Sequence, residues 1–535
     1  MAPRADHLVL HETDEADNHT AVFIYSEPSD SSKLSPARVD ISPTFKPPSS
    51  WSKDGLIALL CDVFLPSGFP DSVTTDYLPY QIYDSLQAFC SSIAGLLSSR
   101  AVLQGIGVGN VDASPTNALL LQILQDTSGR IATILFAHRV GTALEPECKT
   151  YRLAADVFND IAMIMDCLSP MVPAGTMRVS VLSTAGVLRA LCGVAGGSSK
   201  ASLSAHFAKW GNLAELNAKD SSQETIISLV GMLVGSVIVS HITGFKMTWA
   251  ALLFLLASHL SLNYAAVRSV EMTSLNRQRA SMVFSAIIES DNYGTKKKVT
   301  NLPIPTPAQI ALNERILAKG SPFFWSSQRH PERQSLGTAE MGVSLAEFFA
   351  RSHAVATSTS TNSESGSDKD KDRANAIATN TSRAFHTTLP LKALKTLFEK
   401  EEYLLYLTNQ SKSQSQPSKW HASILLTPSA TTKTQLKAWC HALIVARALI
   451  EPEPTSTRSS TRTQSPDSTT ERESTNDEST KKPDTVFGYI SETLTKLNED
   501  GRFEGYLSAL RGRGWDVDVS ALEVRAGRRV LIEFG

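Results

Sequence analysis

Long apolar segments in the middle of the chain predict helices of membrane-spanning length. Residues 226–245 carry no formal charge, and residues 247–267 form a comparable run after the single Lys246. A helix of about 20 apolar residues crosses the hydrocarbon core of a bilayer. Basic residues follow the second run, from Arg268 to the lysines at 296–298, and predict a cytosol-facing tail. We therefore expect at least two spanning helices; the alternative is that these segments are buried helices of a large soluble bundle.

Apolar residues at helical spacing predict further helices before these runs. They cover residues 84–102, 116–138, 151–168 and 179–194. We expect the glycine-rich sequence 105–109 to end the first of these helices. The glycines within 193–197 should end the last one, and an amphipathic stretch follows at 202–216.

Polar residues interrupt two of these helices and give the first candidate site. Arg152 and Asp156 stand four residues apart, as do Asp126 and Arg130, so each pair shares a helix face. In a membrane bundle such groups must face protein or a water-filled cavity. One interpretation is a polar pocket or pathway; the other is an ion-pair network between helices, or a solvated face outside the membrane. The candidate residues are Asp126, Arg130, Arg152, Asp156, Asn159 and Asp160.

A polar cluster at residues 218–225 leads directly into the first long apolar run. The sequence Ser221-Ser-Gln-Glu224 fits a capping box, with Ser221 as N-cap and Glu224 reaching back to it. This interpretation makes Lys219 a residue at the membrane edge. The competing hypothesis is that Lys219, beside an apolar region, binds pyridoxal phosphate as a Schiff base. Further along, Gly231 and Gly235 have the spacing that lets a second helix approach closely.

The C-terminal half predicts a smaller domain with interruptions. Helices are expected at residues 391–407, 434–449, 486–497 and 503–510, and strands at 420–426 and 529–533. Ser/Thr-rich tracts near 355–384 and 452–484 are too polar to bury a core and predict a disordered linker and a disordered insertion.

The predicted fold class is therefore mainly α: a multi-spanning helical membrane bundle followed by a small α+β domain, with disordered Ser/Thr-rich insertions. The predicted boundaries are 1–50 for a variable, largely disordered region, 52–290 for the bundle, and 385–451 with 485–535 for the C-terminal domain.

Composition and motifs argue against several classes of function. The formal net charge of −2 gives no electrostatic reason to bind nucleic acid. Six scattered cysteines show no metal-ligand spacing and indicate a reducing compartment. No nucleophile elbow, zinc-protease motif or nucleotide-binding glycine loop is present. The N-terminus lacks an apolar signal region, so we expect an intracellular, integral membrane protein in an unspecified organelle.

A set of short motifs occurs in order over residues 52–262. They lie at 64–73, 76–77, 80–81, 105–109, 126–129, 152, 156–160, 169–170, 193–197 and 218–225. In this order they resemble the motifs of the root UVB sensitive family, also described as the vitamin B6 photo-protection and homoeostasis domain. Residues 514–518 also resemble the family, but more weakly.

The resemblance implies a role in vitamin B6 status and UV-B responses, with members acting in pairs. It brings no accepted enzymatic activity, so no catalytic residue, metal site or established cofactor follows from it. We expect a non-enzymatic membrane protein that contacts lipid and forms homo- or hetero-oligomers with another family member. The alternatives are a carrier of a small solute such as a B6 vitamer, and a pyridoxal-phosphate-binding protein that uses Lys219.

Overall fold

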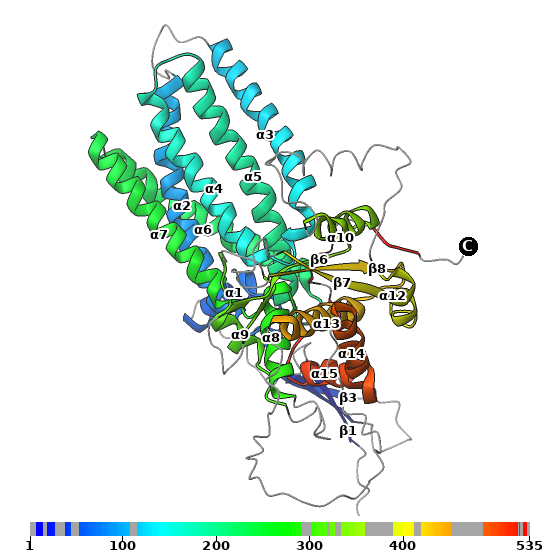
Figure 1. Cartoon of the computed structure of the whole chain (residues 1–535). Helices are drawn as coiled ribbons and strands as arrows, with labels where there is room; N and C mark the ends of the chain where they lie inside the picture. Colours follow the sequence, from blue (N-terminus) through cyan, green and yellow to red (C-terminus); the bar gives the residue numbers. More distant parts are fainter. Residues whose placement is uncertain are drawn as a thin grey trace, which may run out of the picture. The chain divides into compact units, whose positions relative to one another are not determined.

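The computed structural model divides the chain into two compact units, Met1–Glu271 and Met272–Gly535 (Figure 1). The structure describes residues 7–13, 19–26, 38–43, 53–106, 115–242, 244–291, 302–317, 322–326, 333–358, 389–410, 419–450, 485–519, 521–522, 524 and 528–531. Most of the two predicted Ser/Thr-rich tracts lies outside these residues, as does the glycine-rich sequence from residue 107 onward.

The N-terminal region contains a three-stranded antiparallel sheet, in order β1-β2-β3. Its strands are β1 His7–Thr13, β2 His19–Ser26 and β3 Arg38–Pro43. The prediction of a largely disordered region is therefore wrong for these strands. Alternating β-branched and aromatic residues such as Val22, Phe23, Ile24 and Tyr25 favour a pleated strand over a disordered segment.

Long helices make up the rest of the first unit (Figure 1). They are α1 Lys53–Phe64, α2 Tyr77–Ile106, α3 Pro115–Leu144, α4 Cys148–Leu168, the short 3₁₀ helix η1 Ser169–Met171, α5 Thr176–Phe207, α6 Leu213–His241 and α7 Phe245–Ser269. Helix α2 packs against α6 and α7, and α5 packs against α3 and α4. The prediction of a mainly helical fold is confirmed.

Helix α5 is continuous through the glycines at which the sequence predicted its end. It has 32 residues and stops only at Phe207. A glycine inside a helix costs about 1 kcal/mol relative to alanine, an amount that packing offsets. Gly196 faces α4, where a Cβ would lie 3.6 Å from the Cβ of Ala155, an ordinary van der Waals contact. The expected amphipathic stretch is instead the end of α5, a turn, and the start of α6.

Helix α6 begins eight residues before the predicted capping box. Its N-cap is Asn212, and Ser221 and Glu224 lie inside the helix, so the predicted cap is wrong. The hydroxyl groups of Ser222 and Thr225 donate to carbonyls one turn back, those of Ala218 and Ser221. The polar cluster thus remains helical because the hydroxyl groups of Ser222 and Thr225 are satisfied within the helix, and because Ala218, Lys219, Gln223 and Glu224 are good helix formers.

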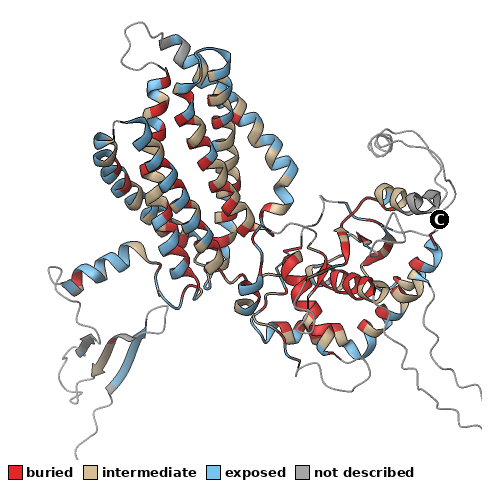
Figure 2. Cartoon of the chain, turned by 60° about the vertical axis from the view of Figure 1, so that its left-hand side comes forward, coloured by how far each residue is buried: buried red, intermediate tan, exposed pale blue. Residues whose placement is uncertain are grey.

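Many residues on the outside of the long helices of the first unit are exposed, and buried residues lie between the helices (Figure 2). The exposed residues include large apolar side chains, and the buried ones include charged side chains beside a small apolar cluster. Within the described part of the chain, four helices are long and apolar enough to cross a membrane: Tyr77–Gly105, Thr176–Phe207, Leu213–His241 and Phe245–Ser269. Leu233 on α6 is 62% exposed and Phe254 on α7 is 72% exposed, whereas Asp156 and Asp160 on α4 are buried. This distribution is the reverse of that in a water-soluble bundle.

The second unit has an ordinary apolar core around a small sheet of order β6-β8-β7. Strand β8 Trp420–Leu426 lies between β6 Gly337–Met341, to which it is parallel, and β7 Tyr403–Asn409, to which it is antiparallel. The other elements are α8 Arg277–Ser290, α9 Pro307–Asn313, β4 Phe324–Trp325, β5 Gln334–Ser335, α10 Leu345–Ser358, α12 Leu391–Leu397, α13 Thr432–Ile450, α14 Val486–Asn498, η3 Glu499–Gly501 and α15 Arg502–Arg511.

Two C-terminal predictions need correction. The helix expected over residues 391–407 ends at Leu397, and Tyr403 begins strand β7. The β7 side chains are mostly buried in the sheet, which outweighs the helical spacing of its leucines. The structure assigns no strand to Arg529, Val530 and Leu531, although the amide of Val530 donates to the Leu426 carbonyl at 2.9 Å.

The first compact unit ends at Glu271, and α8 packs against α13 and β4 within the second unit. The predicted boundary of 290 coincides with the end of α8. The predicted domain boundaries stay predictions.

Candidate functional site

A network of charged side chains joins α4 to α2 inside the first unit. The guanidinium of Arg152 on α4 lies 2.7 Å from Asp84 on α2 and 3.3 Å from Asp156 one turn along α4. Its Nε also donates to the hydroxyl of Tyr80 at 3.3 Å. The amide of Gln87 donates to Asp84 at 2.9 Å. The Arg152 side chain is only 13% exposed, so these ion pairs are largely shielded from solvent.

Helix α7 contributes polar side chains to the same network. The Nδ2 of Asn263 donates to the Oδ2 of Asp156. Nδ1 of His259 lies 2.8 Å from Oδ1 of Asp160, and its Nε2 lies 3.8 Å from Oδ2 of Asp156. His259 and Asn263 are both buried. The network therefore connects three helices, and two of them, α2 and α7, are membrane-length helices.

The structure brings together three of the six predicted pocket residues: Arg152, Asp156 and Asp160. Asn159 lies beside the network, with its amide 3.5 Å from the hydroxyl of Ser91 on α2. Asp126 and Arg130 do not take part. Both are exposed on α3, and the structure shows no ion pair between them.

Sequence reasoning missed the partners of this network on α2 and α7. His259 and Asn263 are four residues apart within an otherwise apolar run, so one face of that helix is polar. A polar pair inside an apolar helix of this length is a signal for a buried interior contact. Asp84 and Gln87 gave a similar signal near the start of α2.

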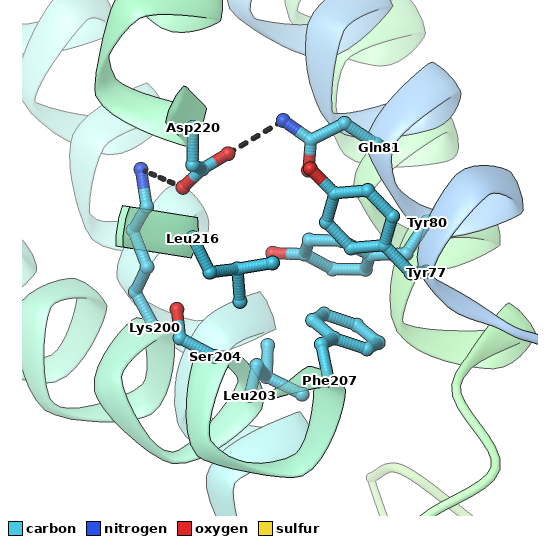
Figure 3. Close-up of a pocket in the computed structure, with 9 residues that line it drawn as sticks. All are labelled: Tyr77, Tyr80, Gln81, Lys200, Leu203, Ser204, Phe207, Leu216 and Asp220. Atoms are coloured by element: carbon cyan, nitrogen blue, oxygen red, sulfur yellow. Dashed lines mark hydrogen bonds and ion pairs between the residues drawn. The ribbon is translucent and has the colours of Figure 1, made fainter. Parts of the chain in front are cut away.

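A small pocket lies between α2, α5 and α6 (Figure 3). Nζ of Lys200 on α5 lies 2.8 Å from Asp220 and 2.7 Å from Glu224, both on α6. The amide of Gln81 donates to the other oxygen of Asp220. Aromatic side chains, including Tyr77, form part of the wall. The free volume is about 10 Å³, which is enough for about one water molecule.

Lys219 does not line this pocket. Its ammonium group donates to the backbone carbonyl of Asp62 near the end of α1, at the exposed side of α6. The lysine at the pocket is Lys200, which follows the glycine-rich stretch of α5. The hypothesis of a Schiff base at Lys219 stays a prediction.

Two further buried carboxylates connect helices of the first unit. Asp76, just before α2, lies 2.9 Å from Nε2 of His206 and accepts from the amide of Glu271 at 2.6 Å. Burial raises the pKa of Asp76, but the contacts with His206 and the Glu271 amide outweigh it and hold the pKa below its usual value. Asp166 on α4 accepts from Ser98 on α2 at 2.8 Å and pairs with Arg189 on α5.

The two glycines predicted to allow close helix packing lie against α2. A Cβ on Gly231 would come within 2.7 Å of the Cβ of Ser92. A Cβ on Gly235 would come within 2.8 Å of Leu96 and 3.3 Å of the backbone of Ile93. Helix α6 therefore approaches α2 at a distance that larger residues at these two positions would prevent.

The described residues contain no group of three or more histidine, cysteine, aspartate or glutamate side chains arranged to hold a metal ion. The second unit has a larger cavity of about 540 Å³, bordered by Phe398, Leu404 and Leu531 among others.

These features define a helical protein with a charged interior and an apolar exterior, followed by a small α+β unit. Residues 50–291 match the family model described as the vitamin B6 photo-protection and homoeostasis domain. Residues 386–528 match the model described as root UVB sensitive protein, C-terminal. Together the two matches cover more than half of the chain, which belongs to the root UVB sensitive family.

Curated relatives agree with this assignment. The chain is 43% identical over 267 residues to RUS family member 1 of Dictyostelium discoideum, covering 49% of this chain and 48% of that protein. It is 36% identical over 261 residues to protein root UVB sensitive 3 of Arabidopsis thaliana, covering 48% and 59%. A weaker match to root UVB sensitive 5 of the same plant, at 23% identity, covers 88% and 76%.

The chain spans about half the length of the first two of these relatives. No solved structure matches the chain.

Proposed function

We propose that the chain is a non-enzymatic protein of an intracellular membrane that contributes to vitamin B6 homoeostasis through protein partners. The observation that supports membrane insertion best is the inverted distribution of side chains in the first unit. Large apolar residues such as Leu233 and Phe254 are exposed on membrane-length helices, while the Arg152 network is buried between them. Lipid accommodates the first group, and protein must enclose the second.

Membrane fractionation tests this placement. We expect the full chain to remain in the membrane pellet after a carbonate wash, because four apolar helices anchor it. A peripheral membrane protein in the same extract is the control and should be released. Recovery of the chain in the wash would contradict membrane insertion. Topology mapping at Lys219 and at the C-terminus then shows which side each segment faces.

The role in vitamin B6 homoeostasis is supported by the family model that covers the first unit. Cells lacking the chain are expected to show an altered pool of B6 vitamers that the intact chain restores. Purified protein incubated with each vitamer should leave it chemically unchanged, as a non-enzymatic role requires. Turnover of a vitamer by the purified chain would contradict that part of the proposal.

A role for protein partners is supported by the exposed polar face of α3. Gly129 packs on α5. A Cβ added to Gly129 would lie 3.2 Å from the Cβ of Ala190, which is near the middle of that membrane-length helix. Asp126 and Arg130 flank this contact and are exposed. Charges at that depth are unfavourable against hydrocarbon, so a second protein covering the face would stabilise them.

Cross-linking tests this partner surface. A cysteine at the exposed Thr127 is expected to form a cross-link to a neighbouring protein in native membranes, in a background where Cys61 is alanine. A cysteine at Val237 on α6, which is also exposed, is the matched control and should remain unlinked. Mass spectrometry of the product distinguishes a second copy of this chain from another family member. Equal labelling at the two positions would argue against a specific surface.

A second candidate function is transport of a small solute such as a B6 vitamer. It is favoured by the pocket at Lys200 and Asp220, which lies between membrane-length helices and next to aromatic side chains. Because its volume is about 10 Å³, the pocket must open before a vitamer enters.

Reconstituted vesicles distinguish this candidate from the first. Transport predicts uptake of labelled vitamer by the intact chain, and loss of uptake in Lys200→Gln and Arg152→Ala proteins that still fold. Lys219→Gln is the control, because Lys219 lies outside the pocket. Absence of uptake for every vitamer would reject transport and leave the first proposal standing.

A further inference from the structure

We propose that His259, Asp160 and Asp156 form a proton-binding site inside the helix bundle, and that its occupancy controls the packing of α7 on α4. The inference goes beyond the proposed function. It rests on the burial, charge and geometry of these side chains and does not depend on any partner or solute.

Acidic groups outnumber fixed basic groups in this part of the bundle. Asp84, Asp156 and Asp160 face the single guanidinium of Arg152, which contacts the first two. Asp160 is in contact with no fixed positive charge among the described residues. Its side chain is 4% exposed, so solvent does little to stabilise an unpaired carboxylate there.

His259 is the titratable basic group in contact with the excess charge. Its side chain is 3% exposed, and its two ring nitrogens face carboxylate oxygens of Asp160 and Asp156 at 2.8 and 3.8 Å. A neutral imidazole has one donor nitrogen and one acceptor nitrogen, whereas the imidazolium has two donors. Only the protonated ring therefore presents a donor toward each carboxylate.

Unpartnered acceptor atoms indicate the same need for a proton. The Oδ1 of Asn263 has no hydrogen-bond partner, although the side chain is fully buried and its Nδ2 is bound to Asp156. Neither carboxylate oxygen of Asp160 makes an aligned hydrogen bond, despite the short distance to His259. The site thus contains more acceptors than donors, and an added proton reduces this mismatch.

Charged and titratable groups from three helices surround the imidazole. They are Arg152, Asp156 and Asp160 on α4, Asp84 on α2, which acts through Arg152, and Cys192 on α5, which lies near both aspartates. Loss of the proton leaves the carboxylates of α4 facing a neutral α7. The contacts of the Asn263 amide with Asp156 and with the backbone carbonyl of Arg152 then remain as polar links between the two helices.

The pH dependence of thermal unfolding tests the site in the full chain in lipid nanodiscs. Between about pH 5.5 and about pH 8.5, where histidine side chains titrate, we expect the wild-type midpoint to fall as pH rises. His259→Gln cannot gain or lose a proton and should show a shallower fall. His206→Gln measures the separate contribution of the other buried histidine–aspartate pair. His241→Gln, at an exposed position on α6, should retain the wild-type profile.

A second variant keeps the test decisive if His259→Gln does not fold. Asp160→Asn removes one carboxylate, so a neutral His259 is no longer penalised. We expect this variant to unfold at a higher temperature than the wild type at about pH 8.5 and to depend less on pH. Profiles of Asp160→Asn or His259→Gln that run parallel to the wild type would overturn the proposal. Each variant is compared with the wild type at the same pH, so the pH-dependent contribution of the second unit cancels.

Discussion

The guanidinium of Arg152 is the one fixed positive charge that contacts both Asp84 and Asp156 among the described residues. Replacing it leaves two buried carboxylates without their cation. Removing one partner of a buried ion pair strongly lowers folding stability, because the remaining charge stays buried without compensation. The effect of such a change depends on the charge left behind more than on the volume removed.

We expect Arg152→Met to lower the stability of the bundle by roughly 3–5 kcal/mol, the usual range for an orphaned buried charge. Adding Asp84→Asn should recover part of this loss, because it removes one of the unpaired carboxylates. Thermal unfolding in nanodiscs checks both variants. Arg130→Met, at an exposed position on α3, is the control for a generic effect of losing arginine. Equal destabilisation by the two arginine replacements would show that burial of the ion pair is unimportant.

His441 in the second unit is also a buried histidine, but its ring contacts hydroxyl groups, whereas His259 faces two carboxylates. Its Nδ1 lies 3.0 Å from the hydroxyl of Tyr403, and its Nε2 lies 2.9 Å from the hydroxyl of Thr493. Burial lowers the pKa of His441 to about 3, and no carboxylate contacts the ring to oppose this among the interactions of the described residues. The folded unit therefore holds this side chain neutral.

This shift predicts an acid-dependent stability of the second unit. The unfolded state binds a proton at His441 below about pH 6.5, while the folded state does not until about pH 3. The contribution of His441 is thus fully present above about pH 6.5 and is lost as pH falls, by at most about 1.4 kcal/mol for each pH unit. Denaturant unfolding at a series of pH values measures the slope. His441→Gln should reduce it, and an unchanged slope would count against the assignment.

At the scale of elements, the contact between α2 and α6 depends on two glycines. Gly231 and Gly235 place the α6 backbone against Ser92, Ile93 and Leu96. A Cβ at Gly231 would lie 2.7 Å from the Cβ of Ser92, and one at Gly235 would lie 3.3 Å from the backbone of Ile93. A larger side chain at either position therefore requires neighbouring atoms of α2 to shift.

We expect Gly231→Leu and Gly235→Leu to destabilise the bundle by about 1–3 kcal/mol each, the range for overpacking. The matched control is Gly193→Leu on α5, where a Cβ would meet nothing within 4 Å. Midpoints of thermal unfolding in the same lipid compare the three. Greater damage at Gly193 than at the two α6 glycines would contradict the packing described for α2 and α6.

Some features of the helices and strands could be predicted from the sequence, and others could not. The polar stripe of α4 was predictable, because Arg152 and Asp156 interrupt an apolar helix at one-turn spacing. Their partners Asp84 and His259 lie far away in the chain, and single-chain periodicity carries no information about which helices meet. The glycines in α5 and the polar cluster in α6 suggested helix ends, but packing keeps both helices continuous. Strand β7 was missed because its burial in the sheet decides its conformation.

At the scale of the whole molecule, the two units have different kinds of surface and core. The second unit has its own apolar core, drawn from residues 275–530 and including the fully buried Trp439 and Tyr403. The first unit buries charged networks and exposes apolar helices. This contrast predicts that the two units differ in their need for lipid or detergent.

We expect a fragment of residues 272–535 to be soluble without detergent and to unfold cooperatively. Trp439→Ala in that fragment should cost roughly 3–5 kcal/mol, because a large buried aromatic side chain is removed. Circular dichroism on heating measures the cooperativity of unfolding and the loss of stability in Trp439→Ala. A fragment of residues 53–271 should require detergent to remain in solution. Aggregation of the 272–535 fragment, or a non-cooperative melt, would show that it depends on the rest of the chain.

Two contacts hold the chain just after the end of α7. The ammonium of Lys149 donates to the carbonyl of Val270 at 2.6 Å, and Asp76 accepts from the amide of Glu271. His259 lies 11 residues before Val270, and Phe245 lies 25 residues before it. A helix that turned about Val270 as a rigid body would therefore move about twice as far sideways at Phe245 as at His259, in proportion to the rise of the helix. Because α7 packs on α2, we expect any such movement to involve α2 as well.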